Sequence, residues 1–295
     1  MQWGAASDVG RRRRNNEDAW GAFPEAGAWC VADGMGGAEG GETASRAVVS
    51  ELGAALRRWG ALVPPLSLPD RAELFARAAD AASAWIFDWA ARNGAPGAGT
   101  TLAAVLLDPA RPGRPLALHA GDSRLYRLRG RRLSRITEDH SVAGLAGVRD
   151  ESELPPGFRN LVTRAVGVRP RVELEKTPFR LAPSDRLLLC SDGLYRMVSD
   201  GGIAEVLHAA ATPEEAAAAL VARANDAGGE DNVTALVLFA PERFGRPASV
   251  RPRLGAAGLD ALAAAAGTDE DETEDTRPTA QTEPAAAGAT ERKGP

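Results

Sequence analysis

The sequence predicts an α+β domain with antiparallel sheets. Two observations lead to this class. Short apolar runs are joined by very short links, such as the Arg-Gly-Arg at 129–131, and links of this length join antiparallel hairpins and not parallel strands. Helical patterns stand in pairs outside this strand-rich block, whereas in a doubly wound parallel sheet they would alternate with single strands.

Strands are predicted where short apolar runs are bounded by turn residues. Among these runs, "LLLC" before Ser191 is strongly apolar, which is typical of a strand buried on both faces. In chain order, the predicted strands cover residues 2–7, 28–32, 100–107, 116–120, 124–129, 132–137, 186–191 and 233–239.

Helices are predicted where apolar residues recur at helical spacing, as Val48, Leu52 and Leu56 do. Asp70 is expected to cap the second helix and Thr212 the last one. An insert rich in Gly, Pro and charge, residues 140–160, is expected to be irregular. In chain order, the predicted helices cover residues 42–59, 70–92, 202–211 and 213–227.

The composition is that of a globular protein with a sizeable core, because 44% of the 295 residues are hydrophobic and 25% are charged. A net charge of -5 provides no basic field for nucleic acid. No apolar run approaches the roughly 20 residues of a membrane span, and the N-terminus lacks the apolar core of a signal peptide. We therefore expect a cytoplasmic monomer.

The cysteines and histidines predict neither a disulfide nor a zinc site. Cys30 and Cys190 both lie inside apolar runs without a CxxC neighbour, so we expect two buried thiols in a reducing compartment. The three histidines are not clustered along the chain, and we therefore expect no histidine-based metal site.

The chain is expected to divide into a folded domain at 1–241 and a disordered tail at 242–295. The tail is acidic and rich in Thr, Pro and Ala, with almost no large apolar residue. Only the stretch 258–266, "GLDALAAAA", has some helical tendency. The tail could be a docking arm or a solvated extension without a partner, and the sequence leaves both open.

Acidic residues recur where apolar strands begin or end. One such acid alone is an ordinary turn residue. Neighbouring strand ends lie about 5 Å apart, so several acids at one edge would repel each other unless cations lay among them. Oxygen donors suit Mg²⁺ or Mn²⁺ and argue against zinc, and glycines beside the acids expose backbone carbonyls as further donors. These acids are Glu17, Asp18, Asp33, Asp122, Asp192 and Asp231.

An arginine run, "RRRRNNED", stands directly before the first acidic pair. A guanidinium group matches phosphate oxygens with two parallel hydrogen bonds. We expect one of the four arginines to bind phosphate, and Arg11, Arg12 and Arg14 to form a solvated charged edge.

These motifs, in this order, resemble the metal-dependent protein phosphatases of the protein phosphatase 2C (PPM) family, particularly its compact bacterial members. The resemblance covers residues 2 to about 240, and the order of the motifs carries it. It implies a four-layer α-β-β-α sandwich with two packed antiparallel sheets. The motifs are "SDVGRRRRNNED", "VADGMGG", "GTTLAAVLL", "HAGDSRLYRLR", "ITEDHSV", "VTRAVG", "LLLCSDGL" and "EDNVTALV".

The resemblance also implies which residues would hold two Mn²⁺ or Mg²⁺ ions. Asp33 would bridge both ions, and the carbonyl oxygen of Gly34 would reach one of them. Asp192 and Asp231 would complete the protein ligands, with Asn232 orienting Asp231 through a hydrogen bond.

Further roles follow from the same resemblance. Glu17 and Asp18 would hold water on the ions or bind them at the rim of the site. Asp122, with Asp192, resembles the acids of a third, looser metal site. Arg13 takes the position of the family's phosphate-binding arginine. Arg13, Asp33, Asp192 and Asp231 are therefore the candidate catalytic residues.

The implied chemistry is direct attack on phosphorus by a water activated between two divalent ions. Because the water attacks directly, no phosphoenzyme is needed. Neither cysteine stands in a phosphate-binding loop, which excludes a cysteine nucleophile. Many eukaryotic relatives have a histidine after the bridging Asp-Gly, where this chain has Met35. His140, or a water at the third ion, could instead protonate the leaving group.

The resemblance implies a phosphatase for phosphoserine and phosphothreonine that opposes bacterial Ser/Thr kinases and acts on their substrates. A phosphatase-like scaffold without activity is the alternative, although it would be expected to have lost one of the central acids. A two-metal nuclease or a phosphatase of small esters is a third possibility, and the acidic composition disfavours nucleic acid.

Overall fold

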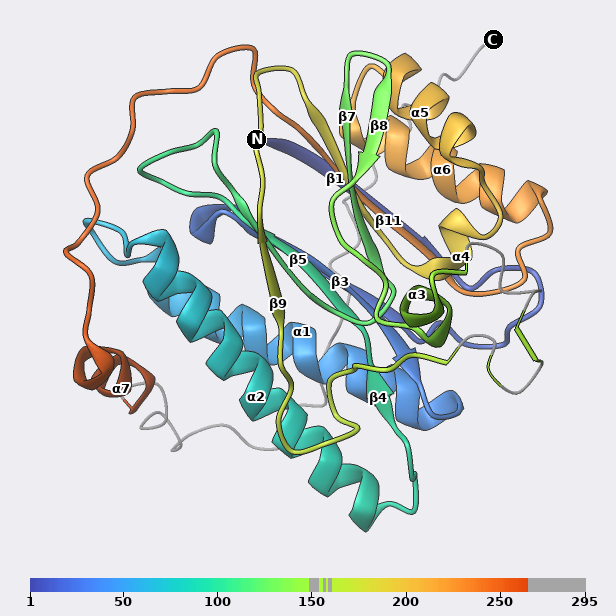
Figure 1. Cartoon of the computed structure of the whole chain (residues 1–295). Helices are drawn as coiled ribbons and strands as arrows, with labels where there is room; N and C mark the ends of the chain where they lie inside the picture. Colours follow the sequence, from blue (N-terminus) through green and yellow to red (C-terminus); the bar gives the residue numbers. More distant parts are fainter. Residues whose placement is uncertain (149–153, 156–157, 159–160, 265–295) are drawn as a thin grey trace, which may run out of the picture.

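The computed structural model describes residues 1–148, 154–155, 158 and 161–264. Two sheets pack face to face between two layers of helices (Figure 1). Helices α1 (Ala38–Gly60) and α2 (Leu68–Arg92) cover one sheet, and α6 (Pro213–Asp226), with α5 (Asp200–Ala209) beside it, covers the other. The predicted α+β class and the implied four-layer sandwich are confirmed.

Every strand pairing in the two sheets is antiparallel. One sheet has the spatial order β1 (Gln2–Asp8), β11 (Val233–Phe239), β10 (Arg186–Cys190), β7 (Arg124–Arg129) and β8 (Arg132–Arg135). The other has the order β2 (Asp18–Phe23), β3 (Ala28–Met35), β5 (Leu102–Leu106), β6 (Leu116–Ala120) and β9 (Glu175–Pro178), with β4 (Gly99–Thr100) pairing β3.

Several elements differ from the sequence prediction. Strands β2 and β9 were not expected, because one is interrupted by glycine and the other, "EKTP", has no apolar pattern. Neither were the short helices α3 (Val142–Ala146) and α4 (Asp192–Tyr195). The predicted cap of α2 is wrong: Ser67 is the N-cap, and its hydroxyl both accepts from the Asp70 N–H and donates to the Asp70 carboxylate.

The centre of the sandwich is an apolar layer between the sheets. Trp29 and Val31 of β3 face Leu187, Leu189 and their neighbours on the opposite sheet, and all four are buried. Alternate residues of the same strands, among them Cys30 and Cys190, pack against the outer helices. Both cysteines are free and buried, as predicted. Burial raises the pKa of Cys30 to about 12, so its thiol is not ionised at neutral pH.

Part of the segment expected to be disordered contacts the domain. Helix α7 (Ala256–Ala264) lies beside α2, where Leu259 is buried (Figure 1). Asp260 forms an ion pair with Arg77 of α2, and the Leu254 N–H donates to Asp70. The rest of the predicted tail, 265–295, lies outside the described residues. Among the described helices, none is long and apolar enough to cross a membrane.

We predict that Leu236→Ala destabilises the fold by about 2–5 kcal/mol, because Leu236 is fully buried between the sheets and its truncation leaves a cavity. Urea unfolding followed by circular dichroism measures the change. Leu145→Ala is the matched control: this side chain is 79% exposed, and its truncation is expected to cost no more than about 0.5 kcal/mol. Equal losses in both variants would contradict the assignment of this core.

Candidate active site

The acids predicted from sequence gather at one edge of the sandwich. Asp18 is the register partner of Asp33 across strands β2 and β3. In the other sheet, Asp192 follows β10 and Asp231 precedes β11, and these two strands run antiparallel side by side. Asp122 stands between β6 and β7, which belong to different sheets. Antiparallel pairing therefore brings together acids that lie far apart in sequence.

Asp33 is held by the strand β4 and the start of β5. Its backbone N–H donates to the Thr101 hydroxyl at 3.0 Å, and its carbonyl oxygen accepts from the Thr101 N–H at 2.9 Å and the Thr100 hydroxyl at 3.0 Å. The next residue, Gly34, lies so close to the carbonyl of Gly41 that a β-carbon there would clash. Glycine is thus required at this position by the close approach of two backbones.

Asp18 is buried beside the opposite sheet. One carboxylate oxygen, Oδ2, accepts hydrogen bonds from the hydroxyls of Ser191 and Thr234, each at 2.7 Å. The other oxygen, Oδ1, is buried and has no hydrogen-bond partner among the residues that the structure describes. A buried carboxylate oxygen without a partner is costly, and a cation at this edge would satisfy it.

Arg13 lies over the acids and contacts one of them. Its guanidinium donates to Asp231 Oδ2 at 2.8 Å, and the side chain remains 50% exposed. Burial lowers the pKa of Arg13, but the hydrogen bond and the charge of Asp231 outweigh this and raise it. Arg12 instead pairs with the exposed Glu230. Of these two arginines, only Arg13 contacts one of the candidate acids and also offers an open face to solvent.

Asn232 forms the expected hydrogen bond with Asp231, but through its backbone and not through its side chain. Its side chain does not orient Asp231; it accepts from the Glu17 N–H at 2.8 Å and donates to the carbonyls of Val9 and Asn15. The contact with Asp231 comes from the backbone N–H of Asn232, which donates to Oδ1 at 2.8 Å. The side-chain amide of Asn232 thus hydrogen-bonds the N-terminal loop, which carries Glu17, and connects this loop to the start of β11.

Arg196 also lies in this site, although it was not among the residues expected from the sequence. Its guanidinium lies 3.0 Å from Asp192 Oδ2 and 3.8 Å from Asp122 Oδ2. The signal was available, because residues four apart on a helix share a face and Arg196 follows Asp192 by four. Arg196 therefore links Asp192, which follows β10 of one sheet, to Asp122, which lies where the chain passes from one sheet to the other.

The carboxylates oppose one another's ionisation. Burial raises the pKa of Asp33 well above its ordinary value, and the charges of Asp18, Asp192, Asp122 and Asp231 raise it further. Burial likewise raises the pKa of Asp18 and of Asp122 to about 7. Arg13 and Arg196 balance only part of this charge. The donor set consists of oxygens, carries a surplus of negative charge and leaves one buried oxygen unsatisfied, so it fits hard divalent cations.

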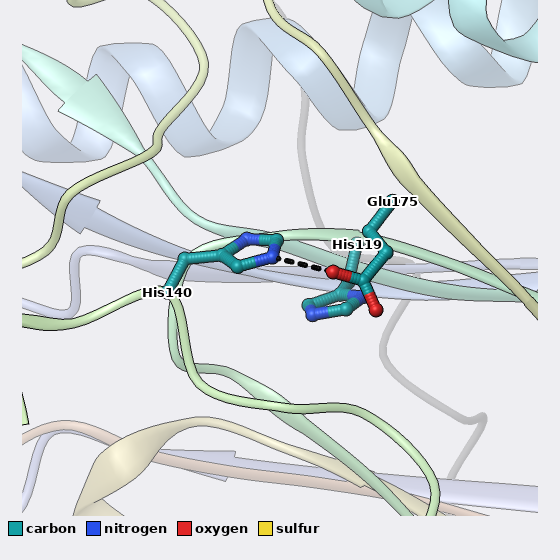
Figure 2. A group of neighbouring side chains, drawn as sticks. All are labelled: His119, His140 and Glu175. Carbon is teal, nitrogen blue, oxygen red and sulfur yellow. Dashed lines mark hydrogen bonds and ion pairs between the residues drawn. The ribbon is translucent and has the colours of Figure 1, made fainter. Parts of the chain in front are cut away.

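A second cluster of titratable groups lies beside this edge and was not predicted. The three histidines are scattered along the chain, but two of them meet in the fold, where the rings of His119 and His140 stack with centroids 4.3 Å apart. Glu175 joins them by accepting a hydrogen bond from His140 Nε2 at 3.0 Å (Figure 2). Only the fold brings them together: His119 and Glu175 are register partners on β6 and β9, and His140 follows β8.

Comparison with known proteins agrees with this geometry. The family model described as Protein phosphatase 2C matches residues 10–226. The chain is 33% identical over 240 residues to the serine/threonine phosphatase stp of Listeria monocytogenes, covering 79% of this chain and 93% of that protein.

Two solved structures share the fold. PppA of Pseudomonas aeruginosa, described as a key regulatory component of a type VI secretion system, is 36% identical with a TM-score of 0.71; the match covers 80% of this chain and 96% of that one. The catalytic domain of PstP, determined with two manganese ions, is 34% identical with a TM-score of 0.67, over 80% and 96% of the two chains. By sequence, fold and motif order, the chain belongs to the protein phosphatase 2C family.

Proposed function

We propose that this protein phosphatase hydrolyses phosphoserine and phosphothreonine in proteins with the help of two Mn²⁺ or Mg²⁺ ions. The observation that carries the proposal is the convergence of buried carboxylates beside the half-exposed Arg13. The solved PstP domain holds two manganese ions in the same fold, which supports the number and the kind of ion.

The ligand set that we propose centres on Asp33, with the carbonyl of Gly34, Asp192 and Asp231 around it. Support comes from the raised pKa of Asp33, to which its burial and then the charges of Asp18, Asp192, Asp122 and Asp231 contribute, because it shows that these acids lie near one another. In PP2C-type sites two such ions, when bound, lower the pKa of a water between them and neutralise charge on the phosphoryl group.

The remaining acids are assigned to the rim. Glu17 and Asp18 stand at the start of β2, and Asp18 keeps its unpartnered Oδ1 at the site. Asp122, with Asp192, is our candidate for a third, looser ion, because Arg196 is the group that bridges these two acids in the structure. A cation there would take the place of that guanidinium.

Arg13 is assigned to the substrate phosphate. The ion pair with Asp231 holds the guanidinium beside the acids while half of the side chain remains open to solvent. This arrangement supports a fork that binds two phosphoryl oxygens and turns the phosphorus toward the acidic edge. The buried thiols of Cys30 and Cys190 are not available as nucleophiles, which favours direct attack by water.

The proton for the leaving group is assigned to solvent water and not to His140. Both ring nitrogens of His140 already have partners within the protein: Nδ1 accepts from the Gly121 N–H, and Nε2 contacts Glu175. A general acid must reach the leaving oxygen with its proton, and the Nε2 proton of His140 is already donated to Glu175.

The partners that we propose are proteins that carry phosphoserine or phosphothreonine. Ser/Thr kinases attach these phosphate groups, so the phosphatase would oppose such kinases. We propose a monomer. The inactive scaffold considered above finds no support, since each acid of the proposed ligand set is present and near the others. A membrane or nucleic-acid partner is not part of the proposal.

We predict that hydrolysis of p-nitrophenyl phosphate and of a phosphothreonine peptide requires Mn²⁺ and stops with EDTA. Asp33→Asn and Asp192→Asn are expected to lower kcat by about 100-fold or more, because each removes a charged ligand from the proposed ions. Steady-state kinetics at saturating Mn²⁺ measures the loss. Asp88→Asn, on the exposed face of α2, is the matched control and should keep full activity. Turnover that survives chelation would contradict the metal-dependent reaction.

Arg13→Ala is expected to raise KM for the phosphopeptide by about 10-fold, because it removes charge-assisted hydrogen bonds to the phosphate. Arg13→Lys should recover only part of the affinity, since an ammonium group cannot bind two oxygens as a fork. Arg12→Ala is the control, because Arg12 pairs with Glu230 and not with the acids. An unchanged KM in Arg13→Ala, with a raised one in Arg12→Ala, would move the phosphate-binding role to Arg12.

We propose residues 1–241 as the catalytic domain, since the candidate residues lie between Arg13 and Asp231. A chain ending at Pro241 is expected to keep kcat/KM within about twofold while losing about 2 kcal/mol of stability, because Leu259 no longer covers α2. Phosphatase assays and urea unfolding of both chains measure the two effects. A folded but inactive short chain would assign part of the active site to residues 242–295.

A further inference from the structure

His119, His140 and Glu175 form a cluster beside the acidic edge that the proposed reaction does not use (Figure 2). We call it the histidine clamp. His119 is fully buried, and its Nε2 contacts the carbonyl of Glu138 at 2.7 Å. Its ring stacks on His140 with an interplanar angle of 11°. Stacking on the buried His119 ring therefore restricts the orientation of the His140 ring.

Two hydrogen bonds of His140 determine its tautomer; in that tautomer the third contact, from Arg164 Nη1 to Nε2 at 3.4 Å, joins two donors and is not a hydrogen bond. A backbone N–H can only donate, so His140 Nδ1, 3.3 Å from the Gly121 nitrogen, is the acceptor. The proton of the neutral ring is then on Nε2, where it is donated to Glu175 at 3.0 Å. The hydrogen bond to His140 lowers the pKa of Glu175, which therefore stays ionised and accepts this proton at neutral pH.

Gly121 is held by His140 from two sides. Besides the side-chain contact, the backbone N–H of His140 donates to the Gly121 carbonyl at 3.0 Å. Gly121 has a φ of +107°, and a β-carbon there would lie 2.7 Å from Thr101. Thr101 is the residue that bonds the backbone of Asp33 on both sides. The Gly121 peptide is therefore locked between His140 and the strand that positions Asp33, and Asp122 follows it directly.

The same three side chains have the composition of a metal site, but their geometry argues against one. Their candidate ligand atoms lie within 4.8 Å of one another. However, imidazole lone pairs lie in the ring plane, and two nearly parallel rings do not direct them at one point. His140 Nε2 carries its proton toward Glu175, and the guanidinium of Arg164 lies 3.4 Å from the same nitrogen. A cation would have to displace both.

We propose that His140, held in its Nε2–H tautomer by Glu175, is a positioning residue that fixes the Gly121 peptide and thereby sets where Asp122 stands in the acidic cluster. The proposal rests on the proposed function, in which Asp122 helps to hold the third, looser ion. The side chain of His140 contacts Gly121, Glu175 and Arg164, and the proposal assigns it no contact with substrate or ions.

Calorimetric titration of the metal-free full chain with Mn²⁺ tests the clamp without turnover. His140→Ala is expected to weaken the weakest Mn²⁺ site by about 10- to 100-fold. His140→Asn places its Oδ1 where Nδ1 stands, keeps the acceptor for the Gly121 N–H, and should stay within about threefold of the wild type. Glu173→Gln, two residues before Glu175 and exposed, is the control. Equal losses in His140→Ala and His140→Asn, or none in His140→Ala, would overturn the proposal.

Two NMR measurements separate the clamp from the proposed function. In the wild type, imidazole ¹⁵N shifts should show His140 as the neutral Nε2–H tautomer, and an Nδ1–H tautomer would overturn the clamp. The Gly121 amide should exchange with solvent at least about 10-fold faster in His140→Ala than in the wild type or His140→Asn. If the wild type neither binds Mn²⁺ nor hydrolyses phosphate esters, the proposed function fails, while Gly121 exchange still decides whether His140 holds the peptide.

Discussion

Mutual repulsion among buried carboxylates is the constraint on which the site depends. Two like charges about 4 Å apart repel by about 4 kcal/mol even at an effective dielectric constant of about 20, so several acids at one edge cannot all ionise unaided. Hydroxyl donors at Asp18 and the guanidinium groups of Arg13 and Arg196 offset part of this. The remaining electrostatic repulsion among the carboxylates is unfavourable in the metal-free protein. Divalent ions bound between the carboxylates would turn it into attraction.

A rigid scaffold is needed to hold such groups together. The mostly apolar strands β10 and β11 are packed on both faces, between the inter-sheet core and the outer helices, and Asp192 and Asp231 lie at their adjacent ends. On the opposite sheet, pairing of β2 with β3 sets Asp18 beside Asp33. These acids lie at or near the ends of strands that pack into the core, so the packing of the core opposes the repulsion at the edge.

The surrounding polar groups connect these strand ends. Asn232 ties the N-terminal loop to β11, Thr101 ties β5 to Asp33, and the histidine clamp ties the Gly121 turn to β9. In each case an amide, hydroxyl or imidazole group holds a backbone group of a candidate acid or of the residue next to one. Support of this kind keeps an oxygen ligand within the few tenths of an ångström that coordination requires. The protein phosphatase 2C fold of this chain thus places the chemistry on strand ends and its support in the turns between them.

The sequence alone determined the fold class, most strands and helices, and the acids, since apolar periodicity and Asp-Gly strand ends are local signals. It did not reveal β9, whose polar residues form an edge strand only because β6 is there to pair with. For the same reason the histidines looked separate: His119, His140 and Glu175 meet through a strand register, which no local pattern encodes. The residue types were readable from the chain, but which backbone group each one holds was decided by tertiary structure, because hydrogen-bond partners distant in sequence are set by packing.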